Sequence, residues 1–402
     1  MVKKWVYSSF LYLLIISLLG ILLRWKMVEP VWPELSFMHI VHAHSHVAFL
    51  GWVYILINAV FIQHCFPAGF SERRAIKIYY FLLHVSVIGM LFSFSYQGYG
   101  LISIGFSTLH AFLSYYFAYQ FFIHRNTHPK GIVRSFYQAA VWFNLLSSLG
   151  PWGLAIAGAT GLGNETINNF FIYYYLHLQY NGWFTFVIIG IIYHLLASER
   201  NLQYRWVKWQ FGLLAVSVIP SYLSSALWLL SQPIFVAIGL IGSLLQFISI
   251  SMLLMMTAKL LWKRERSFSL RLLLSVSLAS LGVKSLLELM GAWPLLAYAI
   301  YDSRQVIIAY LHLTLLGFIT TFLMYFSGKV YAQSKITGPY VAFYLLGVVS
   351  MIILLFLAGL LQWMQWPLPK GIWMSLLGTG ILTTLGIVGF FIDIQRGFRV
   401  SN

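Results

Sequence analysis

Apolar runs long enough to cross a membrane recur along the whole chain. Each run holds about 20 residues, which as an α-helix would span the roughly 30 Å hydrocarbon core of a bilayer. The bilayer core offers no water to peptide groups, so these runs predict helices. Twelve spans are expected, near residues 5–23, 38–63, 76–95, 101–123, 134–159, 167–196, 208–231, 233–262, 269–293, 304–327, 340–362 and 371–392.

Charged residues fall mostly between these runs or close to their ends. Twenty of the 25 Lys and Arg residues lie at the N-terminus, in the even-numbered loops or at the C-terminus. By the positive-inside rule, this distribution predicts a multi-pass protein of the inner (plasma) membrane with both termini in the cytoplasm. No small-residue cleavage site follows the first run, only Arg24, Trp25 and Lys26, so we expect this run to be the first span and not a cleaved signal.

Composition supports a membrane protein and narrows its chemistry. Hydrophobic residues make up 60% of the chain and charged residues 8%, and the mean hydropathy is +0.82. The net charge of +16 is explained by topology, so the expected partner is the lipid bilayer and not a nucleic acid. The single Cys65 excludes an internal disulfide and a thiolate-ligated cluster, so histidine is the expected metal ligand.

One short motif occurs three times: a histidine, a glycine five residues later and an aromatic residue six residues later. Its histidines are His46, His177 and His312. Cutting the chain near residues 133 and 267 places the motif on the second of four spans in every part. We therefore expect a single polytopic membrane domain with three internal repeats, about 1–133, 134–266 and 267–402.

The motif places its histidines at similar depth. Each lies about 8–10 residues inside its span, or roughly 12–15 Å from the external side, so the three side chains could meet. Neutral imidazole ligates haem iron, copper and zinc, which would explain the cost of burying it. The glycines, among them Gly51 and Gly317, would let a neighbouring helix or a flat ring approach closely.

Span 2 carries additional histidines. His39, His42 and His46 share one helical face, whereas His44 points elsewhere and corresponds to Tyr175 and Tyr310 in the other repeats. We expect His39 and His42 to lie in water near the external interface.

Two further histidines have no repeated context. His84 and His110 are expected to be core residues. Arg304, at the external mouth of span 10, is expected to be an interfacial anchor or a partner of haem propionates.

Lys284 and Glu288 lie well inside span 9, one helical turn apart, and should form an ion pair. Two interpretations stay open. The pair either orients span 9 as a satisfied buried pair, or it belongs to a proton path or polar cleft.

With twelve spans, cytoplasmic termini, three four-helix units and histidines on spans 2, 6 and 10, the chain resembles subunit I of the haem-copper oxidases and nitric oxide reductases. The resemblance implies an all-α integral membrane fold of three pseudo-symmetric four-helix units. It also implies a low-spin haem b held between a histidine of span 2 and one of span 10. These positions correspond to His46, with His44 or His42 as alternatives, and to His312.

The chain also departs from this family. Tyr310 stands where the family has the histidine that ligates a second haem. His177 matches one copper ligand, but residues 206–230 contain no histidine for the others, and Tyr180 follows His177 at a spacing one residue shorter than in the family. The resemblance therefore favours a bis-histidine haem b and does not favour a second haem or copper.

Three functional hypotheses follow. The first is a haem b protein acting in electron transport or, as an oxidoreductase, in reduction of O2 or NO, with a cytochrome subunit or a quinol as electron donor. The second, from a looser resemblance, is a haem- and metal-containing protein of nitric oxide response similar to the NnrS family. The third is a transporter or assembly factor for a transition metal or haem. Candidates for a second site or a proton path are Tyr175, Tyr180, Tyr310, Lys284 and Glu288.

Overall fold

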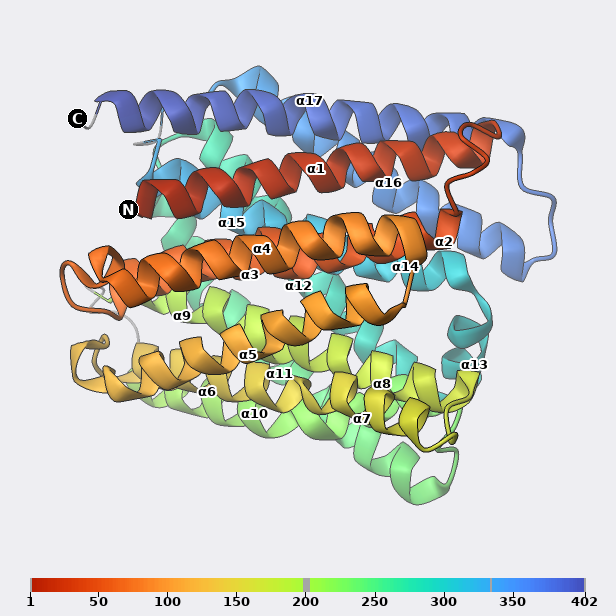
Figure 1. Ribbon diagram of the computed structural model, residues 1–402. Helices are drawn as coiled ribbons and strands as arrows, with labels where there is room; N and C mark the ends of the chain where they lie inside the picture. The colour runs from red at the N-terminus through yellow and green to blue at the C-terminus, as the bar shows by residue number, and fades with distance from the viewer. Residues whose placement is uncertain (1, 198–202, 333–334, 401–402) are drawn as a thin grey trace. The chain divides into compact units, whose positions relative to one another are not determined.

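The computed structural model describes residues 2–197, 203–332 and 335–400, and the regular structure in these ranges is helical (Figure 1). Within them, ten helices are long and apolar enough to cross a membrane. These are Val2–Val28, Phe37–His64, Arg74–Gln97, Leu101–Ile123, Ile132–Ala159, Pro233–Arg264, Phe268–Gly291, Arg304–Val330, Gly338–Trp363 and Gly371–Arg399. The prediction of an all-α, multi-pass membrane protein is confirmed.

The two remaining predicted spans are also helical. Residues 167–196 correspond to α8 (Glu165–His177), η4 (Leu178–Phe184) and α9 (Thr185–Leu195). Residues 208–231 correspond to α10 (Tyr204–Tyr222) and the short η5 (Leu223–Ala226). Polar side chains such as Gln179 and Gln210 lower the hydropathy of both segments, so neither is among the ten, and the count of twelve spans stays a prediction.

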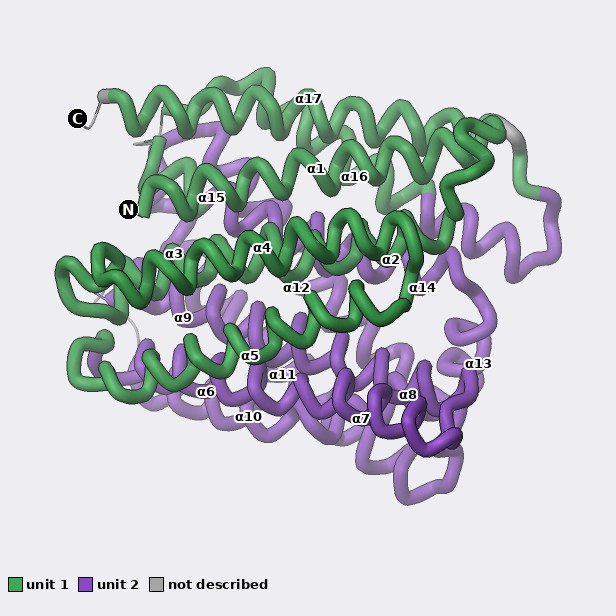
Figure 2. The backbone as a smooth tube through the Cα atoms, viewed as in Figure 1, with its two compact units in different colours: residues 1–129, 326–354, 368–402 green, residues 130–325, 355–367 purple. Residues whose placement is uncertain are grey.

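The chain forms two compact units, which Figure 2 distinguishes by colour. Unit 1 comprises residues 1–129, 326–354 and 368–402. It contains α1 (Val2–Val28), α2 (Phe37–His46), η1 (Val47–Val53), α3 (Tyr54–His64), η2 (Phe70–Glu72), α4 (Arg74–Gln97), α5 (Leu101–Ile123), η3 (Arg125–Thr127), α17 (Lys370–Val400), and parts of α15 (Thr321–Val330) and α16 (Gly338–Trp363). Helix α1 packs on α17, where Phe10 stacks on Phe391 with ring centroids 5.7 Å apart.

Unit 2 comprises residues 130–325 and 355–367. Besides α8, η4, α9, α10 and η5, it contains α6 (Ile132–Ser147), α7 (Leu149–Ala159), α11 (Pro233–Arg264), α12 (Phe268–Gly291), α13 (Pro294–Asp302), α14 (Arg304–His312) and η6 (Leu313–Thr320). The short η5 and α11 are joined by a hydrogen bond of 2.9 Å between the hydroxyls of Ser224 and Ser243. The three-repeat division of the chain is not tested by these units and stays a prediction.

Every motif histidine occupies the same place in its helix. His46, His177 and His312 are the last α-helical residues before a π-helical segment, which is η1, η4 and η6 respectively. A π-helix bonds residue i to residue i+5, the spacing between histidine and glycine in the motif, and such segments are frequent at functional sites. The sequence repeat is therefore also a repeat of an uncommon backbone geometry.

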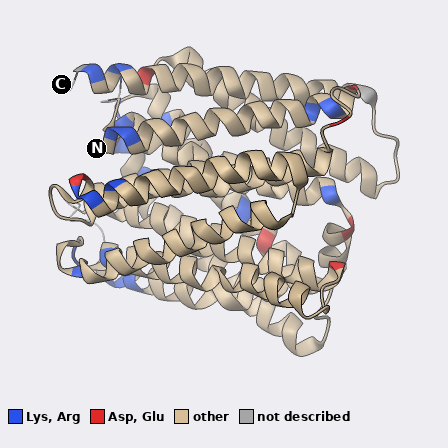
Figure 3. Ribbon diagram, viewed as in Figure 1, with Lys and Arg blue, Asp and Glu red and all other residues tan. Residues whose placement is uncertain are grey.

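Basic residues gather at helix ends within each unit (Figure 3). In unit 1 the Lys3 ammonium lies 5.6 Å from the ring centre of Phe398, so the start of α1 meets the end of α17. In unit 2 the Arg264 guanidinium donates to the Leu195 carbonyl at 2.6 Å, which joins the ends of α11 and α9. This grouping is typical of the cytoplasmic ends of membrane helices.

Large apolar side chains lie exposed on the outer faces of these helices. Phe81 and Phe92 of α4 and Met255 of α11 are 64%, 68% and 75% exposed. A soluble protein would bury most of this surface, whereas a bilayer solvates it.

Candidate functional site

His46 is held in one orientation by its own helix. Its Nδ1 atom lies 2.9 Å from the carbonyl oxygen of His42, and its ring stacks on Phe94 with centroids 4.0 Å apart. A carbonyl oxygen only accepts hydrogen bonds, so Nδ1 carries the proton. The lone pair of the neutral ring is then on Nε2.

His312 repeats this arrangement in unit 2. Its Nδ1 atom lies 2.8 Å from the carbonyl oxygen of Ile308, again one turn earlier. In metal sites, a histidine ligand commonly donates its second ring N–H to such an acceptor, which fixes the tautomer. His46 and His312 thus share the hydrogen-bonding state that suits an iron ligand.

His177 has the opposite arrangement. Its Nε2 atom lies 2.9 Å from the carbonyl oxygen of Val218 on α10 and 3.2 Å from the Ser221 hydroxyl, so here Nε2 carries the proton. The Asn181 side-chain nitrogen lies 3.2 Å from Nδ1 and donates to it. Both ring nitrogens are engaged and the residue is only 1% exposed, which favours a hydrogen-bonding role over the predicted metal ligation.

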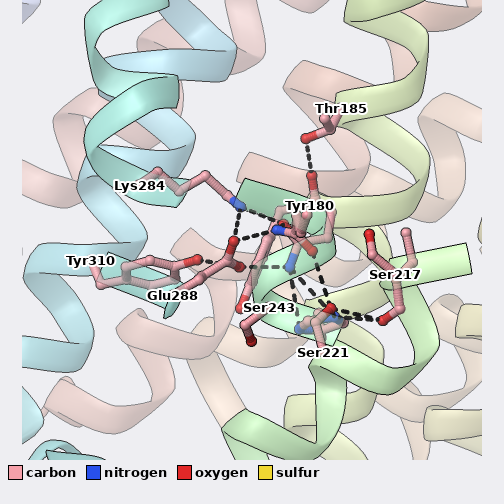
Figure 4. A network of polar contacts seen from close by, with 12 residues as sticks. Tyr180, Thr185, Ser217, Ser221, Ser243, Lys284, Glu288 and Tyr310 are labelled. Atoms are coloured by element: carbon pink, nitrogen blue, oxygen red, sulfur yellow. Dashed lines mark hydrogen bonds and ion pairs between the residues drawn. The ribbon is translucent and has the colours of Figure 1, made fainter. Parts of the chain in front are cut away.

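Lys284 and Glu288 form the expected ion pair, with Nζ 2.7 Å from Oε2. Their side chains are 2% and 13% exposed. Glu288 Oε1 also accepts the Tyr310 hydroxyl at 2.6 Å and the Asn181 amide at 2.7 Å, and Gln246 donates to Oε2. Figure 4 shows the Lys284, Glu288 and Tyr310 side chains pointing toward one another.

Asn181 joins the ion pair to His177. Its Oδ1 atom accepts from Lys284 and, at 3.2 Å, from Gln246, while its Nδ2 atom donates to Glu288 and His177. The Ser221 hydroxyl donates to Gln246 Oε1 at 3.0 Å. We call this set of seven residues the unit 2 network: His177, Asn181, Ser221, Gln246, Lys284, Glu288 and Tyr310.

The unit 2 network joins five helical segments inside one unit. Its residues come from the α8–η4 junction, α10, α11, α12 and α14. A buried ion pair is costly unless further hydrogen bonds satisfy its remaining donors and acceptors, and here such bonds are present. No group of three or more His, Cys, Asp or Glu side chains suited to a metal ion occurs among the described residues.

The predicted tyrosines have different surroundings. The Tyr180 ring lies beneath the Lys284 ammonium, 5.5 Å from Nζ to the ring centre, and its centroid is 6.0 Å from that of Tyr310. Tyr175 instead packs against α7, since a Cβ added to Gly150 would lie 2.8 Å from the Tyr175 Cβ. The structure brings Tyr180 and Tyr310 to the ion pair.

The motif glycines Gly51 and Gly182 permit close helix packing. A Cβ at Gly51 would lie 3.0 Å from Tyr12 of α1 and from Val87 of α4, and a Cβ at Gly182 would lie 2.5 Å from the Phe143 Cβ of α6. Of the two expected roles, the approach of a neighbouring helix is the one that these distances favour at both positions.

The other span 2 histidines lie to either side of His46. His42 supplies the carbonyl that accepts from His46, and its ring lies edge-on to Tyr99 at 4.6 Å. His44 faces α1, where a Cβ at Gly20 would lie 3.5 Å from its Cε1 atom.

Arg304 is the exposed first residue of α14, the helix that ends at His312.

His84 and His110 pack against tyrosine rings. The ring centroids of His84 and Tyr80 are 4.1 Å apart, and those of His110 and Tyr54 are 4.8 Å apart. Both histidines therefore lie among aromatic side chains of unit 1. His110 is buried, as expected of a core residue, whereas His84 is half-buried.

Three network residues were not expected from the sequence: Asn181, Ser221 and Gln246. Asn181 follows His177 by four residues and so shares its helical face, which is a usable signal. Gln246 lies midway along the apolar α11, where a buried amide requires partners. Ser221 offers no signal, because serine is common in membrane helices.

Comparison with known proteins gives no family for this chain. No protein-family model matches it, and no curated protein matches it significantly. The residues of the two histidine sites and of the unit 2 network are therefore the basis for a functional proposal.

Proposed function

We propose that this protein is a membrane-bound haem b protein of electron transport, with His46 and His312 as the two iron ligands. In this proposal the chain has twelve spans in three four-helix units, resembling subunit I of the haem-copper oxidases and nitric oxide reductases. It lies in the plasma membrane with both termini in the cytoplasm. The ten apolar helices and the grouping of basic residues at helix ends support that topology.

One observation carries the proposal. His46 and His312 each donate Nδ1–H to the carbonyl four residues earlier, at 2.9 and 2.8 Å, whereas His177 donates from Nε2 to another helix. The three histidines have equivalent places in the repeat but two hydrogen-bonding states. Only the state of His46 and His312 directs an Nε2 lone pair away from the histidine's own helix.

The donor set of these residues fits haem b. Two neutral imidazoles are the ligands of a six-coordinate, low-spin haem, and such a haem supplies reversible one-electron transfer when bound. His42 and Ile308 would fix the orientation of the two ligands through their carbonyl groups. Two protein ligands leave no open position for a gas, so electron transfer is favoured over reduction of O2 or NO.

A second haem or a copper ion is not part of the proposal. Tyr310 donates its hydroxyl to Glu288, and both nitrogens of His177 have hydrogen-bond partners. The unit 2 network therefore satisfies these residues without a metal. The electron donor would be a quinol or a separate cytochrome subunit.

A second candidate function is that of a transporter for a transition metal or haem, or of an assembly factor that delivers one of these to another protein. The buried Lys284–Glu288 pair favours it, because charged residues inside membrane segments often mark transport pathways. A nitric oxide response protein similar to the NnrS family would, like the first candidate, contain haem. Haem that stays bound to the purified protein therefore distinguishes these two haem proteins from a transporter.

The haem content of the purified protein tests the proposal. Expression with haem supplied, followed by pyridine haemochrome analysis, should give one haem b per chain that stays bound through gel filtration. Loss of haem on the column, or none at purification, would favour a transport role. Two haems per chain would return His177 and Tyr310 to consideration as ligands.

A further inference from the structure

Lys284 is enclosed by groups that attract positive charge. Lys284 is 1% exposed, and its Nζ atom lies 2.7 Å from Glu288 Oε2. Nζ also donates to Asn181 Oδ1 and lies 5.5 Å from the centre of the Tyr180 ring. A carboxylate, an amide oxygen and an aromatic face all attract a small positive charge.

These groups are held in place by partners other than Lys284. Glu288 is fixed by the Tyr310 hydroxyl at 2.6 Å and by the Asn181 amide at 2.7 Å. The Asn181 Nδ2 atom has two acceptors, Glu288 and His177, so its Oδ1 atom must face Lys284. Removing the lysine side chain would leave both oxygens pointing at the position of Nζ.

We propose that this part of the unit 2 network is a monovalent cation site that Lys284 fills with its own ammonium group. Glu288 supplies one negative charge and the site holds one positive charge. When the lysine side chain is absent, a free ammonium or alkali metal ion occupies the same position. Lys284 is thus a tethered cation, and it makes the core of unit 2 independent of dissolved ions.

The charge balance favours a monovalent over a divalent cation. One carboxylate faces the site, and a divalent ion would leave an uncompensated positive charge in a buried position. Ammonium is the closest chemical match to Nζ because it donates hydrogen bonds with the same geometry.

Thermal unfolding of the purified Lys284→Ala variant tests the proposal. Melting is compared in ammonium, potassium, sodium and choline chlorides at equal ionic strength. The wild type should melt at the same temperature in all four salts. The Tm of Lys284→Ala should be lower and should rise with the logarithm of the ammonium concentration, as expected for a ligand of the folded state, but not with choline.

Two matched variants control the experiment. Lys284→Ala/Glu288→Gln removes both charges and should lose the ammonium response. Lys77→Ala breaks the exposed pair Lys77–Glu72, whose atoms are 3.6 Å apart with side chains 55% and 57% exposed, and should show no response. Equal responses of Lys284→Ala to ammonium and choline, or an undiminished response of the double variant, would overturn the proposal.

A measurement on the wild type keeps the proposal testable if these variants do not fold. Among the lysines whose side chains the structure describes, Lys284 alone is buried. Nitrogen-15 NMR of lysine-labelled protein in lipid should show one Nζ signal that is a charged ammonium and exchanges its protons slowly. A neutral amine, or no protected signal, would contradict the tethered cation. None of these readouts depends on haem.

Discussion

The Nε2 atom of His177 lies 2.9 Å from the carbonyl oxygen of Val218, so this histidine donates to a different helix from its own. His46 donates Nδ1–H to its own helix. We therefore predict that His177→Ala keeps the haem but destabilises unit 2. Leaving the buried Asn181 amide and Val218 carbonyl with one partner fewer should cost about 1–3 kcal/mol.

Absorbance spectra and thermal unfolding of His177→Ala, measured on the same sample, check this prediction. The haem bands should match those of the wild type while the Tm falls. Loss of the bands without a change in Tm would identify His177 as a ligand.

The Lys284–Glu288 pair should show strong energetic coupling. Lys284→Met leaves a buried carboxylate unpaired and Glu288→Gln leaves a buried ammonium unpaired, and each should cost about 3–5 kcal/mol. The double variant should cost less than the sum of the two, because it buries no unpaired charge. The unfolding free energies of the wild type, the two single variants and the double variant give the coupling energy between the two residues. If the losses of the two single variants add up to that of the double variant, the pair does not act as a unit.

Close packing at Gly182 gives a prediction with a matched control. Gly182→Ala would place a Cβ 2.5 Å from that of Phe143, so α6 must shift, at a cost of about 1–3 kcal/mol. Gly105 of α5 has no atom within 4 Å of an added Cβ, and Gly105→Ala should be neutral or stabilising. Thermal unfolding of both variants distinguishes crowding from a general effect of alanine, and equal losses would contradict the packing described for η4.

The topology can be tested with one cysteine at a time, because the native Cys65 is buried. Glu34 is an exposed residue between α1 and α2, and Arg266 is an exposed residue between α11 and α12, so each can be replaced by cysteine. A membrane-impermeant maleimide should label Glu34→Cys in intact cells and Arg266→Cys only after the cells are opened. The reverse pattern would place the termini outside the cytoplasm.

Much of the helical architecture was predictable from the sequence, because a bilayer imposes helices on apolar runs of this length. The Lys284–Glu288 pair was also predictable, since residues four apart on a helix are neighbours. The π-helices η1, η4 and η6 were not predicted, although the five-residue spacing from histidine to glycine in the motif matches their period.

The unit 2 network could not be derived from the sequence. Its contacts depend on which faces of α10, α11, α12 and α14 meet η4, and apolar runs do not fix the rotation of one helix against another. The opposite hydrogen-bonding states of His177 and His312 were hidden for the same reason. The motif shows equivalent residues, whereas the choice of nitrogen depends on Val218 and Asn181 in one case and on Ile308 in the other.

The reduced-minus-oxidised absorbance spectrum of the purified protein, expressed with haem supplied, tests the central claim most directly. The wild type and His84→Ala should show the paired bands of low-spin haem b, and both His46→Ala and His312→Ala should lose them. Absence of the bands from the wild type, or their persistence in both His46→Ala and His312→Ala, would contradict a haem held by these two histidines.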